Sequence, residues 1–253
     1  MRREIGLLLL VSAVVLSGCN SHDNGSIKQG ANESQSSPVK TGTERGTKTE
    51  GPEMKTWSSE NDEVKVSVVK VSKYNTPEVV SVEVDGVKKE FNWRVAEDPR
   101  IFYIDVTGDT KPEAVIITNL GRGSDSSIDE LHVLNSSDLS EIKVPNYEEV
   151  SANIETNVTK AKDGRLTITI EAQGKEYEFN DTVVYPGLDV QDKVLFGGTV
   201  TYGLEKQTLF SYLGGSIGTS PIYVTEILVT YKFDSSKNEF VVDHISPKSV
   251  SEK

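Results

Sequence analysis

Cysteine is nearly absent from this sequence, because Cys19 is the single example in 253 residues. Without a second cysteine the chain forms no intramolecular disulfide, so an ordinary hydrophobic core must stabilise it. Histidine is almost as rare: there are three, and no His-x-x-x-His or His/Cys cluster of the kind that holds zinc is present. The two tryptophans and nine tyrosines are too scattered along the sequence to indicate a sugar-stacking surface.

Basic residues are scarce as well. The chain has 27 Lys and Arg against 39 Asp and Glu, which gives a net charge of −12. Six of the acidic and seven of the basic residues precede residue 58, so residues 58–253 hold 33 and 20 and carry a net charge of −13. Phosphate binding needs clustered Lys and Arg, so we expect no nucleic-acid partner. This acidity suits cation binding, a basic partner or simple solubility.

A mostly apolar run, residues 5–16, follows Arg2 and Arg3 at the N-terminus. The run is too short to cross a hydrocarbon core of about 30 Å as a helix, and its flanks are those of an export signal. The letters LSGC, residues 16–19, come next. They resemble the lipobox of bacterial lipoproteins, which implies that Cys19 receives a diacylglyceryl group before cleavage. An ordinary secretory signal with a stray cysteine is the alternative.

We therefore predict a lipoprotein signal peptide over residues 1–18 and an extracytoplasmic location, anchored to the cell membrane by acyl chains such as palmitate on Cys19. Two acyl chains hold a protein on a membrane where one does not. Residues 19–57 are rich in Ser, Gly, Asn, Thr, Lys and Glu and carry little apolar surface, so we expect a disordered linker. About 38 residues of flexible chain reach roughly 31–37 Å.

Residues 58–253 alternate between apolar and polar residues with a period of two in most places, which is typical of strands. Asp85-Gly86 and Gln173-Gly174 each stand between two such runs and predict hairpins. We expect a mainly β fold of antiparallel sheets and hairpins with one or two packed helices, the α+β class being the alternative. This β-rich extracytoplasmic domain is either single or divided near residues 145–165. Further strands are expected at residues 101–104, 114–118, 131–134, 199–202, 209–213, 223–233 and 240–245.

One segment has the spacing of a helix. Its apolar residues lie three, four and four positions apart, at Tyr147, Val150, Ile154 and Val158. Asn146 is a suitable N-cap, and Glu149 stands three residues later, where the partner in a capping box belongs. The pattern predicts a helix that begins after Asn146 and ends before Asp163-Gly164.

The stretch DVTGDTKPE, residues 105–113, places oxygen-bearing residues at alternate positions. These are Asp105, Thr107, Asp109, Lys111 through its backbone carbonyl, and Glu113. Calcium takes about six to eight oxygens, which binding loops supply from alternate side chains, a carbonyl and a later carboxylate. The stretch is therefore a candidate Ca²⁺ site. The alternative is a solvated turn in which the two aspartates bind nearby backbone amides.

The same stretch resembles the Asp-x-Asn-Gly-Asp-Gly-x-x-Asp/Glu loop of FG-GAP and VCBS-type repeats, which implies calcium held between two strands. Thr107 stands where that loop has Asn or Asp, and Thr110 stands where it has Gly. A single copy is present, so the resemblance does not imply a propeller. Across residues 105–135 and 224–245 the sequence is similar to Gram-positive, Bacillus-type surface lipoproteins of unassigned activity, which implies a surface location and a β-rich domain.

One hydrolase-like pattern is present. Gly214-Gly215-Ser216-Ile217-Gly218 matches Gly-x-Ser-x-Gly, and Asp234 or Asp243 and then His244 follow in the order of a triad. A nucleophile elbow needs a helix directly after the serine, and the sequence predicts a strand there, so we interpret residues 214–218 as a Gly-rich hairpin turn. Two functions stay open. We expect a binding or interaction module without enzyme activity, acting on a surface protein or wall component. The alternative is a cell-wall hydrolase.

Overall fold

The part of the chain that the structure describes contains fifteen strands and one short helix. This structure is a computed structural model, and it describes residues 54–181, 190–218 and 221–250. The strands form three sheets with mostly antiparallel neighbours, so the predicted mainly β fold is confirmed. The predicted signal peptide, Cys19 and the linker up to residue 53 lie outside the described residues.

Two of the sheets are small. The first has the order β1-β2-β3-β4, with β1 (Thr56–Ser58), β2 (Val64–Val71), β3 (Pro77–Val84) and β4 (Val87–Phe91). The second has the order β11-β10-β9, with β9 (Ile154–Lys160), β10 (Leu166–Ala172) and β11 (Lys175–Asp181). All neighbours in these two sheets run antiparallel.

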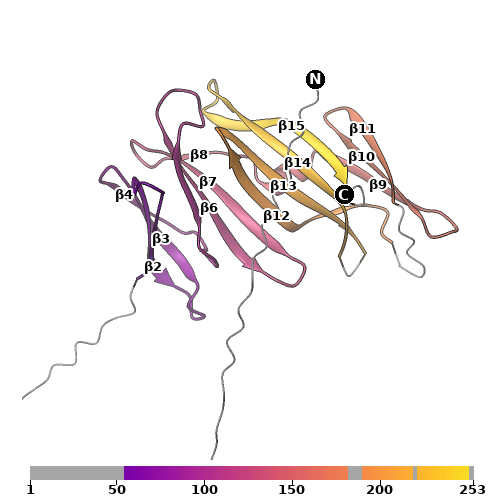
Figure 1. Cartoon of the computed structure of the whole chain (residues 1–253), viewed down its shortest axis with the longest axis horizontal. Coiled ribbons are helices and arrows are strands. Elements are labelled where there is room, and N and C mark those ends of the chain that lie inside the picture. Colours follow the sequence, from indigo (N-terminus) through magenta and orange to yellow (C-terminus); the bar gives the residue numbers. More distant parts are fainter. Residues whose placement is uncertain (1–53, 182–189, 219–220, 251–253) are drawn as a thin grey trace, which may run out of the picture. The chain divides into compact units, whose positions relative to one another are not determined.

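The third sheet has eight strands in the order β15-β14-β13-β12-β7-β6-β5, with β8 beside β7. Figure 1 shows β12 to β15 side by side in orange and yellow. β12 runs parallel to β7, and a parallel pair needs a long crossover, which here contains the helix and the three-stranded sheet. The strands are β5 (Arg100–Ile104), β6 (Glu113–Arg122), β7 (Ser127–Asn135), β8 (Glu141–Ile142), β12 (Leu195–Glu205), β13 (Thr208–Ile217), β14 (Ile222–Asp234) and β15 (Glu239–Ser249).

Strand β6 is buried on both faces. Ala114 and Ile116 belong to one core together with valines of β2 and β3, which we call the N-terminal core. Val115 and Ile117 belong to the main core, which β9, β10 and the inner face of β12–β15 complete. Successive side chains of a strand point to opposite faces, so an unbroken apolar run is what a strand between two layers requires.

Both predicted two-residue hairpins are confirmed. Asp85-Gly86 joins β3 to β4 with φ angles of 48° and 82°, and Gln173-Gly174 joins β10 to β11 with φ angles of 52° and 70°. Positive φ at both central positions is the type I′ geometry, whose twist matches that of the flanking strands. Aspartate tolerates a positive φ at the first position. Gln173 adopts the same conformation, which shows that a residue without this preference is accepted there when glycine follows.

The predicted helix is confirmed only in its first turn. Helix α1 spans Tyr147–Ser151 and has the expected capping box. The side chain of Asn146 accepts a hydrogen bond from the amide of Glu149 at 2.8 Å, and Glu149 accepts one from the amide of Asn146 at 3.0 Å. The cap residues therefore determined where the helix begins.

The second half of the predicted helix is wrong, because it forms strand β9. A spacing of four residues fits one face of a helix and also one face of a strand. Ile154 and Val158 are buried and Thr156 between them is half-buried, so all three lie on the same strand face. Their β-branched side chains favour this choice, and antiparallel pairing with β10 makes it.

The β-rich part begins slightly before residue 58 and continues through residues 145–165. Strand β1 begins at Thr56, two residues before the predicted start at residue 58, and Trp57 pairs with Val66. Val133, Val150 and Val200, which precede, occupy and follow the region 145–165, share the main core, so this region does not separate two cores. Among the described residues, no helix is long and apolar enough to cross a membrane.

Candidate functional site

The acidic loop between β5 and β6 is a hydrogen-bonded turn. The carboxylate of Asp105 accepts hydrogen bonds from the amides of Gly108 at 2.7 Å and Thr110 at 2.9 Å. The carboxylate of Asp109 accepts one from the amide of Lys111 at 2.8 Å. Such aspartate contacts with amides a few residues ahead order tight turns.

Glu113 is the buried carboxylate of this loop, with 4% of its surface exposed. It accepts hydrogen bonds from the amide of Val106 at 3.0 Å and from the hydroxyl of Thr107 at 3.4 Å. Burial raises the pKa of Glu113 above its ordinary value, and the charges of Asp109 and Asp105 add to this effect. The hydrogen bonds from the loop act in the opposite direction.

Two residues of the loop adopt a left-handed backbone. Gly108 has a φ of 81° and Thr110 a φ of 73°. Glycine adopts this conformation without strain, whereas a β-branched residue there is a genuine outlier. Strain of this kind costs about 1–3 kcal/mol. Thr110 is thus a threonine in a conformation that usually requires glycine.

The loop supplies suitable atoms for calcium but no shared centre in the described arrangement. No group of three or more His, Cys, Asp or Glu side chains within residues 54–181, 190–218 and 221–250 is placed to hold a metal ion. The carboxylates turn to the amides of the loop instead. An ionised carboxylate has about four acceptor sites, so Asp109 and Glu113 keep acceptors beyond these contacts. Calcium binding by Asp105, Thr107, Asp109, Lys111 and Glu113 therefore stays a prediction.

The fold does not bring the suspected hydrolase residues together. Ser216 pairs with Tyr223 of β14, and its hydroxyl donates to the carbonyl of Leu195 at 3.5 Å. His244 pairs with Thr230 of the same strand. Tyr223 and Thr230 lie seven positions apart, which is roughly 23 Å along a strand.

The two candidate acids have other partners. Asp234 accepts hydrogen bonds from Ser236 in the turn between β14 and β15, and Asp243 forms an ion pair with Lys232 at 2.9 Å. Residues 214–218 also differ from the prediction, because Gly214 to Ile217 continue strand β13 instead of forming a turn. These glycines lie in the strand because neighbouring side chains occupy the space where their own would be.

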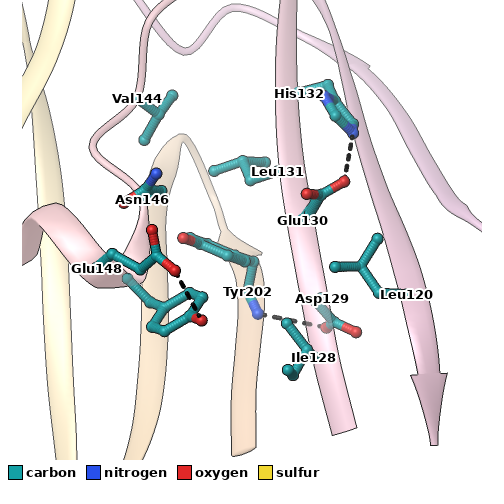
Figure 2. A pocket seen from close by; sticks show the side chains of 11 residues that line it. Leu120, Ile128, Asp129, Glu130, Leu131, His132, Val144, Asn146, Glu148 and Tyr202 are labelled. Atoms are coloured by element: carbon teal, nitrogen blue, oxygen red, sulfur yellow. Dashed lines mark hydrogen bonds and ion pairs between the residues drawn. The ribbon is translucent and has the colours of Figure 1, made fainter. Parts of the chain in front are cut away.

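A cavity of about 290 Å³ opens where β7 and β12 separate (Figure 2). The two strands pair at two positions only, Ser127 with Thr199 and Ile128 with Val200. Farther along, β7 lines one side of the cavity, and Tyr202 and the segment before and within α1 line the other. The opening therefore comes from a break in the ladder of the large sheet.

Asp129 bridges this break. Its carboxylate accepts hydrogen bonds from Arg100 at 2.7 Å and from the amide side chain of Asn119 at 2.8 Å. The amide of Tyr202 approaches the same carboxylate at 3.4 Å, as Figure 2 shows, and Arg100 donates to the carbonyl of Tyr202 at 2.7 Å. The ion pair thus satisfies backbone groups of β12 that have left the ladder.

His132, at the end of this cavity, is engaged through both ring nitrogens. Nδ1 lies 3.1 Å from the carboxylate of Glu141, and Nε2 lies 3.3 Å from the hydroxyl of Thr118. The ring stacks on Trp93 with centroids 3.8 Å apart. The hydrogen bond with His132 is the main cause that lowers the pKa of Glu141. These contacts engage Asp129 and His132 in holding neighbouring elements together.

A larger hollow lies on the outer face of β12–β14, opposite the main core. Along β13, Leu209, Ser211 and Leu213 are buried, whereas Phe210 and Tyr212 are half-buried and point outward. Two cavities of about 490 and 350 Å³ lie along this face and share Tyr212 as a lining residue. We call the two cavities together the groove, and the rings of Phe210, Tyr212 and Tyr223 that line it the aromatic platform. The ring of Tyr212 is steeply inclined to that of Phe210, with an interplanar angle of 72° and centroids 5.5 Å apart.

Glycines hold two of these rings flat against the sheet. Phe210 pairs with Gly203 across the strands, and a Cβ atom on Gly203 would lie 2.3 Å from the ring. Tyr223 covers Gly214 in the same way, with a distance of 2.8 Å. An aromatic ring that covers a glycine on a sheet replaces the packing that the glycine lacks. The platform is therefore built into the sheet.

Hydrogen bonds and charges complete the groove. The hydroxyl of Tyr223 accepts a hydrogen bond from Thr199 at 2.8 Å and donates one to the carbonyl of Asp125 at 2.6 Å. Glu226 and Lys248 form an ion pair at 2.7 Å, and the ammonium of Lys248 lies over the ring of Tyr212, 5.4 Å from its centroid. The residues that line the other cavity include one acid and one base, Glu205 and Lys206. The groove is thus close to neutral in a chain whose net charge is −12.

Reasoning from the sequence missed this groove, since its aromatic residues looked scattered. The available signal was the presence of Gly198, Gly203 and Gly214 inside runs that otherwise have the pattern of strands. Glycine within a strand often marks a close approach by another group. The register of the strands decides which ring covers each glycine, and the positions of the glycines in the sequence do not reveal that register.

Comparisons of this chain with protein-family models, with curated proteins and with solved structures found no match.

Proposed function

We propose that this chain is an extracytoplasmic lipoprotein, anchored to the cell membrane through acylated Cys19, whose β-rich part is a binding module for a surface protein or wall component. The basic, apolar and LSGC segments of the N-terminus support the anchor. The acidic balance of residues 58–253 argues against a nucleic-acid partner.

The groove is the observation that best supports the proposed binding function. Its two cavities, of about 490 and 350 Å³, are lined by aromatic rings and hydroxyls. A concave site with aromatic walls and a few polar groups is typical of ligand binding. The hydrolase alternative has less support, because the register of β13, β14 and β15 keeps Ser216 and His244 apart.

Binding to isolated cell-surface material tests this function. The full-length chain in detergent is incubated separately with washed wall and with a surface-protein extract. Tyr212→Ala removes the ring shared by both cavities, and Tyr74→Ala removes a ring that is 78% exposed in the turn after β2. We expect retention of the wild type and of Tyr74→Ala, and loss of Tyr212→Ala. Equal retention of all three proteins would contradict the proposal.

Calcium is a separate part of the proposal. The acidic loop lies between β5 and β6, as a loop of the FG-GAP type lies between two strands. A calcium ion there would stabilise the loop, and the groove lies on β12–β14, so the two parts can be tested independently.

A further inference from the structure

We propose that the groove binds a neutral polysaccharide chain whose sugar rings lie on Phe210 and Tyr223 of the aromatic platform, with Tyr212 contacting the chain from the side. This inference rests on the binding function above and names the class of its ligand.

The platform has the chemistry to bind sugar rings. The face of an aromatic ring carries partial negative charge, and the C–H groups on the face of a sugar carry partial positive charge. Phe210 and Tyr223 lie flat on Gly203 and Gly214, so one face of each ring is directed away from the sheet. Because these rings are already held in place, binding costs them little conformational entropy.

Hydroxyl groups stand around the platform. Thr201, Tyr212 and Thr230 line the groove, and within the described part of the chain their hydroxyls form no hydrogen bond to protein. A hydroxyl both donates and accepts, as the hydroxyls of a sugar do. The groove therefore offers partners for a ligand that carries many hydroxyls.

The charge of the groove favours a neutral ligand. Each cavity has one acidic and one basic lining residue, whereas the whole chain carries a net charge of −12. An anionic polymer would be repelled by the surrounding protein, and a cationic one would be attracted to more acidic parts of the surface. A neutral chain avoids both effects.

The shape of the groove favours a polymer over a folded protein. From Thr199 to Glu205 it follows β12 over about 20 Å at the usual rise of a strand. Its aliphatic lining residues are Leu228 and Val250. Apart from the aromatic platform, residues that carry hydroxyls are the commonest kind in the lining, so this lining fits an extended, hydroxyl-rich chain.

Titration calorimetry of the full-length chain in detergent tests the inference. The probes are two neutral oligosaccharides, chitohexaose and cellohexaose, and the anionic control is hexagalacturonate. We expect at least one neutral probe to bind and the anionic probe not to bind. Tyr212→Ala should weaken binding about tenfold, which corresponds to about 1.4 kcal/mol. Tyr74→Ala should bind as the wild type does.

Thr201→Val is the second groove variant, because it removes a hydroxyl while keeping the shape of the side chain. We expect it to weaken binding several-fold even if Tyr212→Ala fails to fold. Undiminished binding in both groove variants, or equal binding of the anionic probe, would overturn the inference. If no neutral probe binds but retention on surface material still depends on Tyr212, the ligand class is wrong and the binding function stands. If neither depends on Tyr212, both proposals fail.

Discussion

Glu113 lies at the point where the acidic loop enters the core. Its carboxylate orders the loop by accepting hydrogen bonds from Val106 and Thr107, yet burial opposes its ionisation. A carboxylate in this position contributes to loop geometry in both protonation states. Its ionisation, however, links the stability of the fold to pH.

The change Glu113→Gln tests this link. Because the folded pKa of Glu113 is raised above 4.5, the stability that its protonation contributes is fully present below the unfolded pKa and is lost as the pH rises through the folded pKa. The amide does not titrate and still accepts the bond from Val106. We expect the variant to gain stability relative to the wild type as the pH rises above about 4.5, measured by urea unfolding.

Glu155→Gln is the matched control, because Glu155 is exposed on β9. Its difference from the wild type should change much less over the same range of pH. A constant difference between Glu113→Gln and the wild type would show that burial does not perturb this carboxyl.

Calcium titration tests the remaining role of the loop. If the loop binds Ca²⁺, the ion stabilises the native state by about 2.7 kcal/mol when it is roughly a hundredfold above its dissociation constant. The melting temperature should then rise with calcium and fall with chelator. Asp105→Ala and Asp109→Ala should each abolish the response, and magnesium should substitute poorly because it demands octahedral geometry. A wild-type melting curve indifferent to calcium would refute the metal hypothesis.

At the scale of elements, the β10–β11 hairpin is docked on the edge of β15. The side-chain amide of Gln173 donates to the carbonyl of Asp243 at 3.1 Å and accepts from the amide of Ile245 at 3.1 Å. It thereby imitates one residue of a neighbouring strand. An edge strand presents unpaired backbone groups, and partial cover of this kind limits its pairing with other chains.

The change Gln173→Asn separates this contact from the turn itself. Asparagine tolerates the positive φ of 52° at this position, but its side chain is one methylene shorter. Loss of the two hydrogen bonds should lower the free energy of unfolding by about 1–3 kcal/mol. Lys206→Asn, in the β12–β13 turn with a φ of 56°, is the control and should change stability little. Equal effects of the two variants would assign the loss to the turn.

At the scale of the whole molecule, the large sheet is a layer with a core on each face. The N-terminal core lies on one face of β6 and the main core on the other. The groove lies on the outer face of β12–β14. The side of the sheet that carries the groove is thus the side that the main core does not use.

Anchoring is the prediction that concerns the whole chain. Replacing Cys19 by Ser removes the thiol that receives the lipid, and two acyl chains are what hold such a protein on a membrane. We expect Cys19→Ser to be released to the medium or to keep an uncleaved signal, measured by fractionation and mass. Ser21→Ala, two residues away, should stay with the membrane. Membrane fractionation of Cys19→Ser after signal cleavage would show that the lipoprotein interpretation is wrong.

Local patterns determined much of the fold. The two-residue turns, the capping box at Asn146 and most strands follow from residues that are neighbours in the sequence, where propensity and periodicity act directly. The limit appears at Ile154 and Val158. Their spacing fits helix and strand alike, and pairing with β10, which is formed by later residues, decided between them.

Some candidate sites were predictable from neighbouring residues in the sequence, and others depend on the folded chain. The acidic loop is contiguous, so its carboxylates and their turn were predictable from the sequence. The groove was not predictable, because Phe210 meets Gly203 and Tyr223 meets Gly214 only in one register of three strands. The same register keeps Ser216 away from His244. The register of these strands is set by packing against the main core, because a shift of one residue would turn every buried side chain outward. That packing exists only in the folded chain.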